Sequence, residues 1–411
     1  MKKFFFTLND FSKDGGSTVR MYGILNGLAS QDIDNEIILF SNITNYDNFH
    51  PNIKHIYLGV LFSSKEKRVL QALLTILPTA LVYKMFSNKL EQIYNKLRML
   101  RNEDIENLIF FTYLDNSLAY LLFKKGKIPF YVNDIHGVAT IEFKYKEYVK
   151  IKDKFINLFK YSFAKILDKK VFYYADGFIF VSEAMKNYFL KEYQFIKNKK
   201  LMIVQDGINK NLCCDKVDCD LLKSLKKLYY LKSNEKVLLF VGRFKNLGGV
   251  LDLIDSFNII LKSKKDVKLL LVGDGEDNKQ AIANVEKYNI GNSVIFAGTI
   301  PYKQLVTYQA LADVLICPDK DHPYSQMVPH IKYFDALLSC KPVINGSFDV
   351  IKEINKNECL SIDFIPSDIE DLAKKTIYSL DNLNQLNKKY SNNKEIVCRN
   401  FTYDNNVKEL I

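Results

Sequence analysis

Short runs of apolar residues alternate along the chain with longer stretches in which apolar residues recur every three or four positions. The short runs are nearly continuous, as in strands buried on both faces, and the longer stretches have helical spacing. This alternation predicts parallel sheets covered by helices, with ligand sites beyond the carboxyl ends of the strands. The expected strands are Phe4–Leu8, Glu36–Phe40, Ile53–Leu58, Leu108–Tyr113, Pro129–Val132, Phe178–Val181, Leu201–Val204, Val237–Val241, Leu269–Val272, Val294–Ala297, Val314–Cys317 and Pro342–Ile344.

A polar segment with few strand signals, between Asn209 and Lys236, separates two series of these strands. The chain has 411 residues, which exceeds the length at which one hydrophobic core usually stops growing. We therefore expect an α/β protein with two doubly wound, Rossmann-like domains facing a central cleft, at residues 1–208 and 209–396. The last residues, from about 397 to 411, are expected to form a helix that packs back on the first domain.

The charge balance favours an anionic partner, because 58 Lys and Arg residues against 47 Asp and Glu residues leave a net charge of +11. Lysines are interleaved with aromatic and aliphatic residues over Lys65–Arg101 and Phe143–Lys170. Such basic amphipathic helices can lie on an anionic membrane surface, although solvated faces packed on the domain core explain the pattern nearly as well. The charge is dispersed and no recognition motif is present, so a nucleic-acid partner is not expected.

We expect the protein to be cytoplasmic. Because of its basic amphipathic segments, a peripheral position on the inner face of the cytoplasmic membrane is also expected. The longest uncharged stretch, Val69–Tyr83, is too short to span a bilayer, and the apolar run at the N-terminus is too short for a signal peptide. The seven cysteines contain no C-x-x-C pair, and we expect them to be reduced.

Two glycine-containing loops that follow predicted strands are candidates for phosphate binding. Gly15 and Gly16 lie between the first strand and a helical pattern, where backbone amides can approach a phosphate, although a plain tight turn is the alternative. Gly242 and Arg243 follow the strand Val237–Val241, and a guanidinium there can bind a diphosphate bidentately. Lys245 can add a second cation to this loop.

The stretch from Asp313 to Ile344 combines a buried strand, a polar loop, a helix expected to open near Pro329 and a further strand. Lys332 and Asp335 share a stripe of that helix. A helix N-terminus beside a buried sheet can hold an anion, and a carboxylate can accept hydroxyl hydrogen bonds. This combination suits a sugar nucleotide.

His136 is the most suggestive of the five histidines, because it follows a predicted strand and stands beside a carboxylate and a glycine. A histidine in this position can form a hydrogen bond at a reacting sugar. The chain shows no P-loop, no hydrolase-type nucleophile and no metal-ligand spacing. Cations and helix N-termini can neutralise a diphosphate leaving group, so we expect no metal and no cofactor.

These motifs, in this order, resemble the retaining glycosyltransferases of family 4, also described as glycosyl transferases group 1, which have the GT-B fold. The resemblance covers most of the chain and is stronger in the second domain; little matches between Asn42 and about Leu108. The segments that carry it are the Gly15-Gly16 loop, Asp134-x-His136-Gly137, FIFVSEAMKNYF (178–189), VQDGIN (204–209), VGRF (241–244), LLVGDGED (270–277), VIFAGTIPYKQL (294–305), ADVLICP (312–318) and KYFDALLSCKPVI (332–344).

The resemblance implies roles for individual residues. Arg243 would bind the donor diphosphate, the Gly15-Gly16 loop would lie against the distal phosphate, and His136 would sit near the transferred sugar. Asp335 would replace a glutamate that binds the nucleotide ribose. The Gly273–Gly275 turn would approach the base, as would Gly298, Thr299 and Ile300. By itself, the Gly273–Gly275 segment is more typical of a tight turn that contacts no ligand.

The sequence departs from the family pattern at three positions. Gly248 stands where the family usually has a lysine, which leaves Lys245 or Lys332 as its substitute. Met327 stands eight residues before Asp335, where a glutamate is usual, and Asp335 is itself one methylene shorter than glutamate. The segment from Tyr324 to Pro329, which contains Ser325, is similar to a family variant with a Ser-Pro and Lys-x-Phe-Glu pattern.

The resemblance therefore implies a retaining, metal-independent glycosyltransferase that uses a UDP- or GDP-linked sugar. The acceptor expected for it is a lipid-linked or cell-envelope glycan, of the lipopolysaccharide, capsule or O-antigen type. Two alternatives stay open: a GT-B-like sugar-nucleotide epimerase, which needs no acceptor, and a non-catalytic glycan-binding subunit with a degraded donor site.

Overall fold

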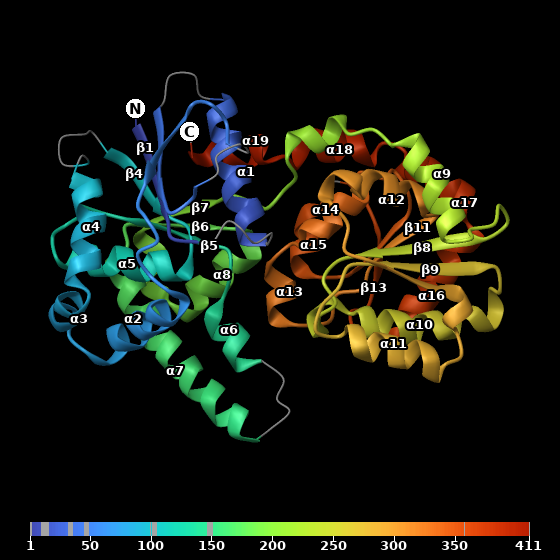
Figure 1. Ribbon diagram of the computed structural model, residues 1–411, viewed down its shortest axis with the longest axis horizontal. Coiled ribbons are helices and arrows are strands. Elements are labelled where there is room, and N and C mark those ends of the chain that lie inside the picture. The colour runs from blue at the N-terminus through green and yellow to red at the C-terminus, as the bar shows by residue number, and fades with distance from the viewer. Residues whose placement is uncertain are drawn as a thin grey trace. The chain divides into compact units, whose positions relative to one another are not determined.

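The computed structural model describes residues 2–9, 16–31, 36–44, 49–98, 100, 105–145, 151–356 and 358–410. The chain divides into two compact units, each built on its own sheet (Figure 1). Unit 1 comprises Met1–Gly207 together with Tyr403–Ile411, and unit 2 comprises Ile208–Thr402. The chain thus crosses from unit 1 to unit 2 after Gly207 and returns after Thr402.

Unit 1 contains a seven-stranded parallel sheet. Its strands are β1 (Lys2–Thr7), β2 (Glu36–Ser41), β3 (Ile53–Tyr57), β4 (Ile105–Phe110), β5 (Val132–Ile135), β6 (Gly177–Phe180) and β7 (Lys200–Ile203). They are arranged in the order β3-β2-β1-β4-β5-β6-β7. The helices are α1 (Gly16–Gln31), α2 (Ser64–Ile76), α3 (Thr79–Met85), α4 (Ser87–Leu97), α5 (Tyr113–Lys124), α6 (Ala139–Lys144), α7 (Ile151–Tyr174), α8 (Glu183–Glu192) and α19 (Tyr403–Asn406).

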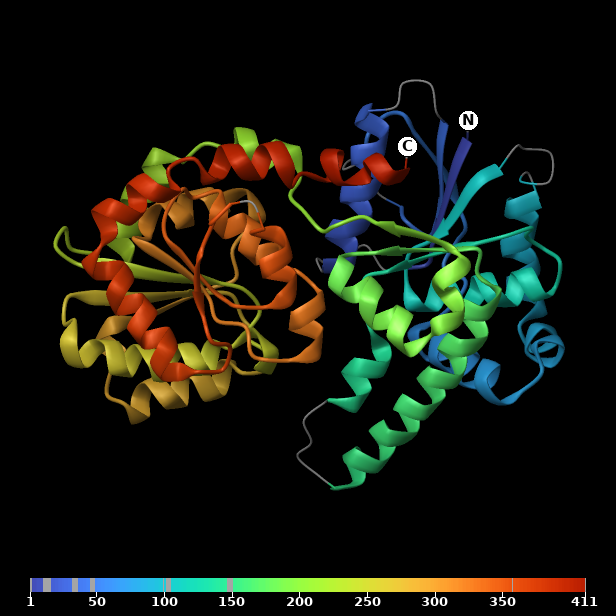
Figure 2. The same ribbon diagram turned by 180° about the vertical axis from the view of Figure 1, so that it is seen from behind.

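The apolar run of β1 explains its central position in this sheet. Phe4, Phe5 and Phe6 are fully buried, and successive side chains of a strand point to opposite faces. Both faces of β1 therefore need a covering layer, and helices supply it on each side (Figures 1 and 2). None of the described helices in either unit is long and apolar enough to cross a membrane.

The C-terminal residues of unit 1 pack on α1 through one large side chain. A Cβ added at Gly23 would lie 2.1 Å from the Tyr403 ring, so glycine makes room for this tyrosine. Further along, the Glu409 carboxylate accepts a hydrogen bond of 2.7 Å from the backbone N–H of Ile203 in β7. The segment that packs on unit 1 thus begins at Tyr403 rather than near residue 397, because α18 (Asn393–Asn400) belongs to unit 2.

Unit 2 contains a six-stranded parallel sheet. Its strands are β8 (Lys236–Val241), β9 (Val267–Val272), β10 (Val294–Gly298), β11 (Val314–Cys317), β12 (Val343–Gly346) and β13 (Ile362–Phe364). Their order is β10-β9-β8-β11-β12-β13. The other helices are α9 (Cys219–Leu228), α10 (Val250–Ser263), α11 (Asn278–Lys287), α12 (Leu305–Leu311), α13 (Pro323–Met327), α14 (Ile331–Leu337), α15 (Asp349–Ile354), α16 (Ile369–Asp381) and α17 (Leu383–Tyr390).

Alternate residues of the central strand β8 belong to two different core clusters. Val237 and Leu239 pack in one cluster, while Leu238 and Phe240 pack in the other. This alternation is what a strand covered by helices on both faces requires. The hydrophobic pattern of β8 therefore positions its carboxyl end, and the loop that follows it, between two packed layers.

Three expectations about the elements are corrected. The strand expected at Pro129–Val132 is β5 (Val132–Ile135), because its pairing with β4 begins with Ile109 opposite Val132. The short strand β13 was not expected at all, since it has only three residues and an aspartate in the middle. The helix expected near Pro329 is α14, which begins at Ile331; Pro323 instead occupies the first position of the unexpected α13.

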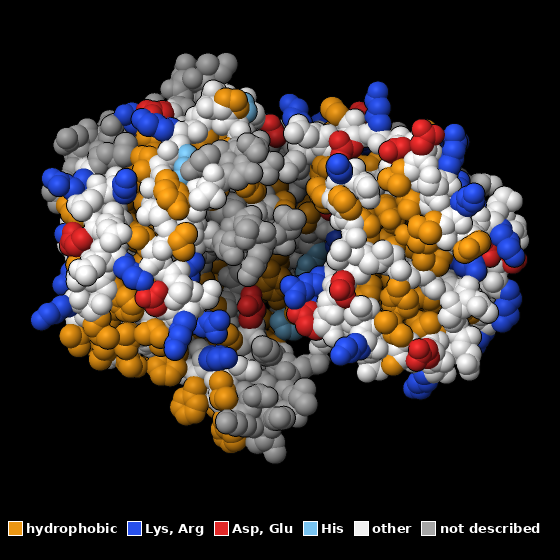
Figure 3. Space-filling model, viewed as in Figure 1, with side chains coloured by type: hydrophobic (Ala, Val, Ile, Leu, Met, Phe, Trp, Pro, Cys, Tyr) orange, Lys and Arg blue, Asp and Glu red, His pale blue; other side chains and the backbone are white. Residues whose placement is uncertain are grey.

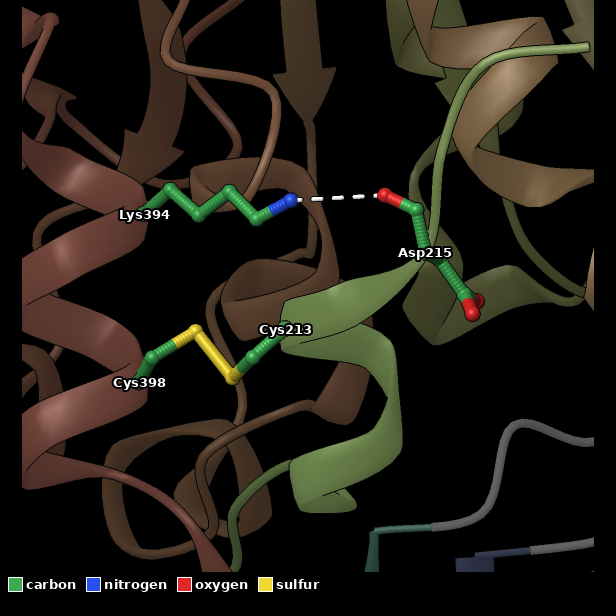
Figure 4. The surroundings of a disulfide bond; sticks show 4 residues. All are labelled: Cys213, Asp215, Lys394 and Cys398. Carbon is green, nitrogen blue, oxygen red and sulfur yellow. Dashed lines mark hydrogen bonds between the residues drawn. A yellow bond between two sulfur atoms is a disulfide. The ribbon is translucent and has the colours of Figure 1, made fainter.

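The expectation of fully reduced cysteines is wrong for one pair. Cys213 in the 3-10 helix η3 (Lys210–Cys214) and Cys398 in α18 form a disulfide across a sequence separation of 185 residues (Figure 4). Beside the disulfide, Lys394 Nζ of α18 donates a hydrogen bond of 3.4 Å to the carbonyl of Asp215, the residue that follows η3. Spacing along the chain did not indicate this pair, because only tertiary packing brings the two segments together.

Candidate functional site

The loops after β8 and β9 are joined through their backbones at the carboxyl edge of the sheet in unit 2. The Gly242 N–H donates to the Val272 carbonyl at 3.0 Å, and the Phe244 N–H donates to the Asp274 carbonyl at 2.9 Å. The Gly273 N–H donates to the Gly298 carbonyl at 2.8 Å, which adds the end of β10 to the same edge. Three strand ends are thus held in one arrangement.

Two of the predicted site glycines are explained by this close approach. Gly273 has φ +133°, and a Cβ there would lie 1.9 Å from the Gly242 carbonyl oxygen. A Cβ at Gly275 would lie 2.2 Å from the Phe244 carbonyl oxygen. The backbones therefore require glycine here without any ligand. Gly298 has φ +70° and open space around it, and Thr299 next to it is exposed. A contact of these residues with a base stays a prediction.

Arg243 extends from the end of β8 into solvent. Its side chain is 67% exposed, and its Nη2 lies 2.6 Å from Glu276 Oε1. Together with backbone bonding at Glu276 itself, this arginine holds the pKa of the Glu276 carboxyl below its usual range. Exposed pairs of this kind contribute little to stability, so a diphosphate can replace the carboxylate at small cost. Lys245 is also exposed on this loop.

The position of the missing family lysine is closed to a side chain. Gly248 is buried, and a Cβ there would lie 2.9 Å from the Arg243 carbonyl oxygen. Its neighbour Gly249 has φ +69°, with its Cβ position 1.7 Å from the Pro318 carbonyl oxygen. This loop packs on the end of β11 by backbone contact, which accounts for the glycine pair.

Asp335 is a buried carboxyl on α14. Its Oδ1 accepts a hydrogen bond of 2.8 Å from the Tyr302 hydroxyl, and its backbone carbonyl accepts one of 2.7 Å from Gln309. Burial raises the pKa of Asp335 to about 7, although the Tyr302 hydroxyl works in the opposite direction. Asp335 also lines a small pocket together with Lys332 and Leu305.

Lys332 is paired inside unit 2 rather than extended into solvent. Its Nζ lies 2.8 Å from Asp319 Oδ1 and 5.2 Å from the centre of the Phe240 ring. His330 Nε2 lies 3.5 Å from the same carboxylate oxygen. Burial lowers the pKa of His330 to about 4, so its ring is neutral at pH 7. Lys332 is thus paired with Asp319, whereas Lys245 is exposed; which of the two substitutes for the missing family lysine stays a prediction.

Ser325 and Met327 are both buried on α13. Among the described residues, the Ser325 hydroxyl has no hydrogen-bond partner, although it is fully inaccessible to solvent. Buried hydroxyl groups normally find a partner, so Ser325 is an exception among the buried polar residues described; its contact with a donor stays a prediction. Met327, which stands where the family usually has a glutamate, is 5% exposed.

His136 follows β5 directly in unit 1 and is oriented from both sides. Its Nδ1 lies 2.9 Å from Asp134 Oδ2, and its Nε2 lies 3.0 Å from Ser17 Oγ near the start of α1. A carboxylate only accepts hydrogen bonds, so Nδ1 carries the proton of the neutral ring, and Nε2 accepts from the serine hydroxyl. Gly16 is the first residue of α1, whereas Gly15 lies outside the described residues.

Arg20 binds the Asp134 carboxylate that also contacts His136. Its Nη2 lies 2.6 Å from Asp134 Oδ1, and its Nη1 lies 2.9 Å from Asp206 Oδ1. Burial opposes the ionised form of Asp134, yet the guanidinium and His136 keep the pKa of Asp134 below its usual range. The Tyr403 hydroxyl, from the returning C-terminal segment, reaches Asp206 at 3.4 Å.

The predicted residues therefore fall into two groups, one at the carboxyl edge of each sheet. The residues that sequence reasoning missed are the partners of these groups. Asp319 has a signal in the sequence, since it follows a strand and a proline directly. Tyr302 and Arg20 lie in helical or turn segments with no such signal, and only the fold brings them to Asp335 and Asp134. Among the described residues, no group of three His, Cys, Asp or Glu side chains is placed to hold a metal ion.

Comparisons with known proteins bear on the class of enzyme and on the fold. Residues 224–396 match the family described as glycosyl transferases group 1. An uncharacterised glycosyltransferase of Methanocaldococcus jannaschii is 24% identical over 92% of this chain and 90% of its own length. An alpha-monoglucosyldiacylglycerol synthase of Streptococcus pneumoniae is 27% identical over 50% of this chain and 45% of its own length.

Similarity to solved structures extends over the whole chain. The Anabaena protein HepE, solved in complex with UDP-glucose, is 15% identical and superposes with a TM-score of 0.70, covering 100% of this chain and 98% of HepE. At this identity the likeness shows the fold. Taken together with the named relatives, the two parallel-sheet units identify the chain as a GT-B-fold glycosyltransferase, in which residues 224–396 of unit 2 match the glycosyl transferases group 1 family.

Proposed function

We propose that this glycosyltransferase moves a sugar from a UDP- or GDP-linked donor to a lipid-linked or cell-envelope glycan acceptor. The proposed reaction retains the anomeric configuration and uses neither a metal nor another cofactor. The observation that carries the proposal is Arg243, an exposed guanidinium at the end of the central strand β8, whose partner Glu276 is equally exposed. A diphosphate offers this guanidinium a bidentate partner of higher charge.

Asp335 is proposed to accept hydrogen bonds from the ribose hydroxyls of the donor nucleotide. Its carboxyl group is buried beside the Tyr302 hydroxyl and lines a pocket with Lys332. A carboxylate accepts several hydrogen bonds, whereas the protonated form also donates one. Since the pKa of Asp335 is raised to about 7, bound hydroxyl groups would favour the ionised form and bring the pKa down.

The transfer step needs a departing diphosphate and an activated acceptor. In the proposed step the bond between the anomeric carbon and the diphosphate oxygen breaks, and the acceptor oxygen bonds to that carbon on the same face. The acceptor proton passes to the departing phosphate oxygen, so the atoms balance without a protein base. Arg243 and Lys245 stabilise the charge that develops on the diphosphate. His136, held by Asp134 and Ser17, is proposed to bind the transferred sugar.

The acceptor is proposed to be an envelope glycan or a glycolipid, made at the cytoplasmic face of the membrane. One relative is named for the synthesis of a glucosyl diacylglycerol, and HepE was solved with UDP-glucose. These names support a nucleotide-sugar donor and a lipid-linked acceptor for this chain. The net charge of +11 favours an anionic membrane surface as a partner.

Arg243→Ala tests the donor site. We expect the variant to bind UDP or GDP at least tenfold more weakly than the wild type, on the order of 1.4 kcal/mol, since the bidentate contact is lost. Thermal-shift titrations against a panel of nucleoside diphosphate sugars, followed by calorimetry with the best nucleotide, measure this difference. EDTA is kept in the buffer, because the proposed chemistry needs no metal.

Arg399→Ala is the matched control for this experiment. Arg399 on α18 is also exposed, at 61%, and also faces a glutamate, Glu395 at 3.9 Å. We expect this variant to bind the nucleotide like the wild type. Equal binding by Arg243→Ala would overturn the role of Arg243, and a failure of every nucleoside diphosphate sugar to bind would overturn the proposed function.

A further inference from the structure

The helix α7 presents an apolar stripe to solvent. Phe155, Leu158, Phe159, Ile166 and Tyr173 are 60%, 60%, 65%, 47% and 61% exposed. Their spacing of three, four and seven residues places them on one face of the helix. Water-exposed aromatic and aliphatic side chains in such a row form a contiguous apolar surface, which monomeric proteins usually keep small unless it serves an interaction.

The exposed stripe is the second of two apolar faces on α7. The other face packs against the rest of unit 1. On the opposite side of the helix, Ala164, Leu167 and Val171 are buried in unit 1. The helix is also anchored to its neighbour α2, because Lys170 Nζ donates hydrogen bonds to the Leu74 and Thr75 carbonyls at 3.0 Å and 2.9 Å. The exposed stripe therefore points outward from a helix that is already packed.

Lysines border the stripe along one side. With 100° of rotation per residue, Lys154, Lys165 and Lys169 follow that border, whereas Lys160 lies on the side of the buried residues, with its Nζ 6.0 Å from the centre of the Phe143 ring of α6. Lys165 is also paired with Glu192 of α8, at 2.9 Å. From Lys154 to Tyr174 the only acidic residue is Asp168, and it is buried. The exposed charges of this part of α7 are therefore all positive.

Neighbouring helices extend the same surface. The N-terminal half of α7 projects beyond the other helices of unit 1 in both views (Figures 1 and 2). Apolar side chains gather on this side of unit 1 over α2, α3 and α7 (Figure 3). On α2 and α3 the exposed apolar residues include Ile76 and Met85, at 62% and 56%.

We infer that α7 docks the protein on an anionic lipid surface, with Phe155, Leu158 and Phe159 inserted among the headgroups. An apolar stripe bordered by lysines is the arrangement of helices that lie in the plane of a membrane interface. A second copy of the chain fits this face poorly, because a two-fold contact would bring the same lysines together. The inference rests on the proposed function, in that a lipid-linked acceptor is reached at this surface.

The absence of tryptophan from the chain permits a direct test. Phe159→Trp places the single indole on the stripe, and Tyr378→Trp places one on α16 of unit 2, at a site 49% exposed. We expect vesicles of phosphatidylglycerol and phosphatidylcholine to shift the emission of Phe159→Trp to the blue. Pure phosphatidylcholine vesicles should cause little shift, and Tyr378→Trp should not respond to either. High salt should reverse the shift.

A loss variant completes the test. Phe155→Ser combined with Phe159→Ser should reduce sedimentation with anionic vesicles at least tenfold, while nucleotide binding stays at the wild-type level. The inference is overturned if Phe159→Trp does not respond to anionic vesicles, or if the serine variant sediments like the wild type. It is also overturned if the blue shift appears without vesicles as protein concentration rises, which would indicate a second copy. A protein that binds vesicles through α7 but binds no nucleotide sugar would leave this docking intact and refute the proposed function.

Discussion

Asp134 in unit 1 and Asp335 in unit 2 are both buried aspartates at the carboxyl edge of a parallel sheet, yet their surroundings are opposite. Asp134 meets the guanidinium of Arg20 at 2.6 Å, and its pKa lies below the usual range. Among the described residues, the Asp335 side chain accepts one hydrogen bond, from Tyr302, and its pKa rises to about 7. The protein itself supplies a cation to the first carboxylate, whereas the second is buried beside a neutral hydroxyl.

The two aspartates also shift stability with pH in opposite directions. The folded pKa of Asp134 is depressed, so its stabilising effect is present above the unfolded pKa and is lost as pH falls through the folded pKa. The folded pKa of Asp335 is raised, so the folded state holds a proton that the unfolded state lacks between about pH 4 and 7. Through Asp335, stability therefore falls as pH rises across that window.

The largest expected effect comes from breaking the completed network of unit 1. Arg20→Met leaves Asp134 and Asp206 buried without their cation, which should cost about 3–5 kcal/mol of unfolding free energy. Urea denaturation at pH 7 measures the loss. Arg399→Met, which removes an exposed arginine, should change stability little. A loss below about 1 kcal/mol for Arg20→Met would contradict the account of Asp134 as a charge held by Arg20.

A smaller effect of opposite sign is expected at Asp335. At pH 8 the wild-type protein must hold the ionised Asp335 carboxylate in a buried position, which lowers its free energy of unfolding. Asp335→Asn removes this charge, so the variant should be more stable than the wild type at pH 8, by about 2 kcal/mol. The gain should shrink as pH falls to 5, where the wild-type carboxyl is protonated. Thermal unfolding at several pH values measures it. Asp134→Asn serves as the contrast, because that variant should lose stability at pH 7.

A constant difference between Asp335→Asn and the wild type from pH 5 to 8 would show that Asp335 keeps an ordinary pKa. The two aspartates would then not have opposite pKa shifts, because the pKa of Asp335 would not be raised. The same variant should also bind UDP or GDP more weakly than the wild type at pH 8, because an amide accepts fewer ribose hydrogen bonds than a carboxylate.

The smallest expected effect separates a ligand-binding hydroxyl from a structural one. The hydroxyl groups of Ser325 on α13 and Ser256 on α10 are both fully buried and have no hydrogen-bond partner among the described residues. Each change to alanine should alter stability by less than about 1 kcal/mol. Only Ser325→Ala should weaken binding of the intact nucleotide sugar, by a few fold in calorimetry. Equal binding by both variants would remove Ser325 from the donor site.

Much of the fold could be predicted, because most strands are unbroken apolar runs that leave little doubt about burial. The errors have local causes. Tyr131 and Val132 continue an apolar run that begins at Pro129, but the pairing with Ile109 starts the strand only at Val132. The strand Ile362–Phe364 is too short to have a periodicity. The Cys213–Cys398 pair was missed because it joins segments 185 residues apart.

The sequence predicted the motif residues of the candidate site but not the residues that form hydrogen bonds and ion pairs with them. Arg243 and His136 follow strands, a position that the topology of parallel sheets marks for ligands. Tyr302 acts on Asp335 from 33 residues away, and Arg20 acts on Asp134 from 114 residues away. No local sequence pattern indicates such pairs. Each partner lies in a helix or turn with no distinctive motif, and only the folded arrangement of the strands and helices brings it into contact with the aspartate.

The sequence by itself determined two helix-covered parallel sheets, the glycines and cations at their strand ends, and a basic chain suited to anionic partners. These properties depend on residue type and short-range periodicity, which are fully present in the chain. Only the tertiary structure decided that Asp134 is charged while Asp335 titrates near neutrality, and that one face of α7 stays uncovered. Burial and charge state depend on what packs against a side chain, and those neighbours come from distant parts of the chain.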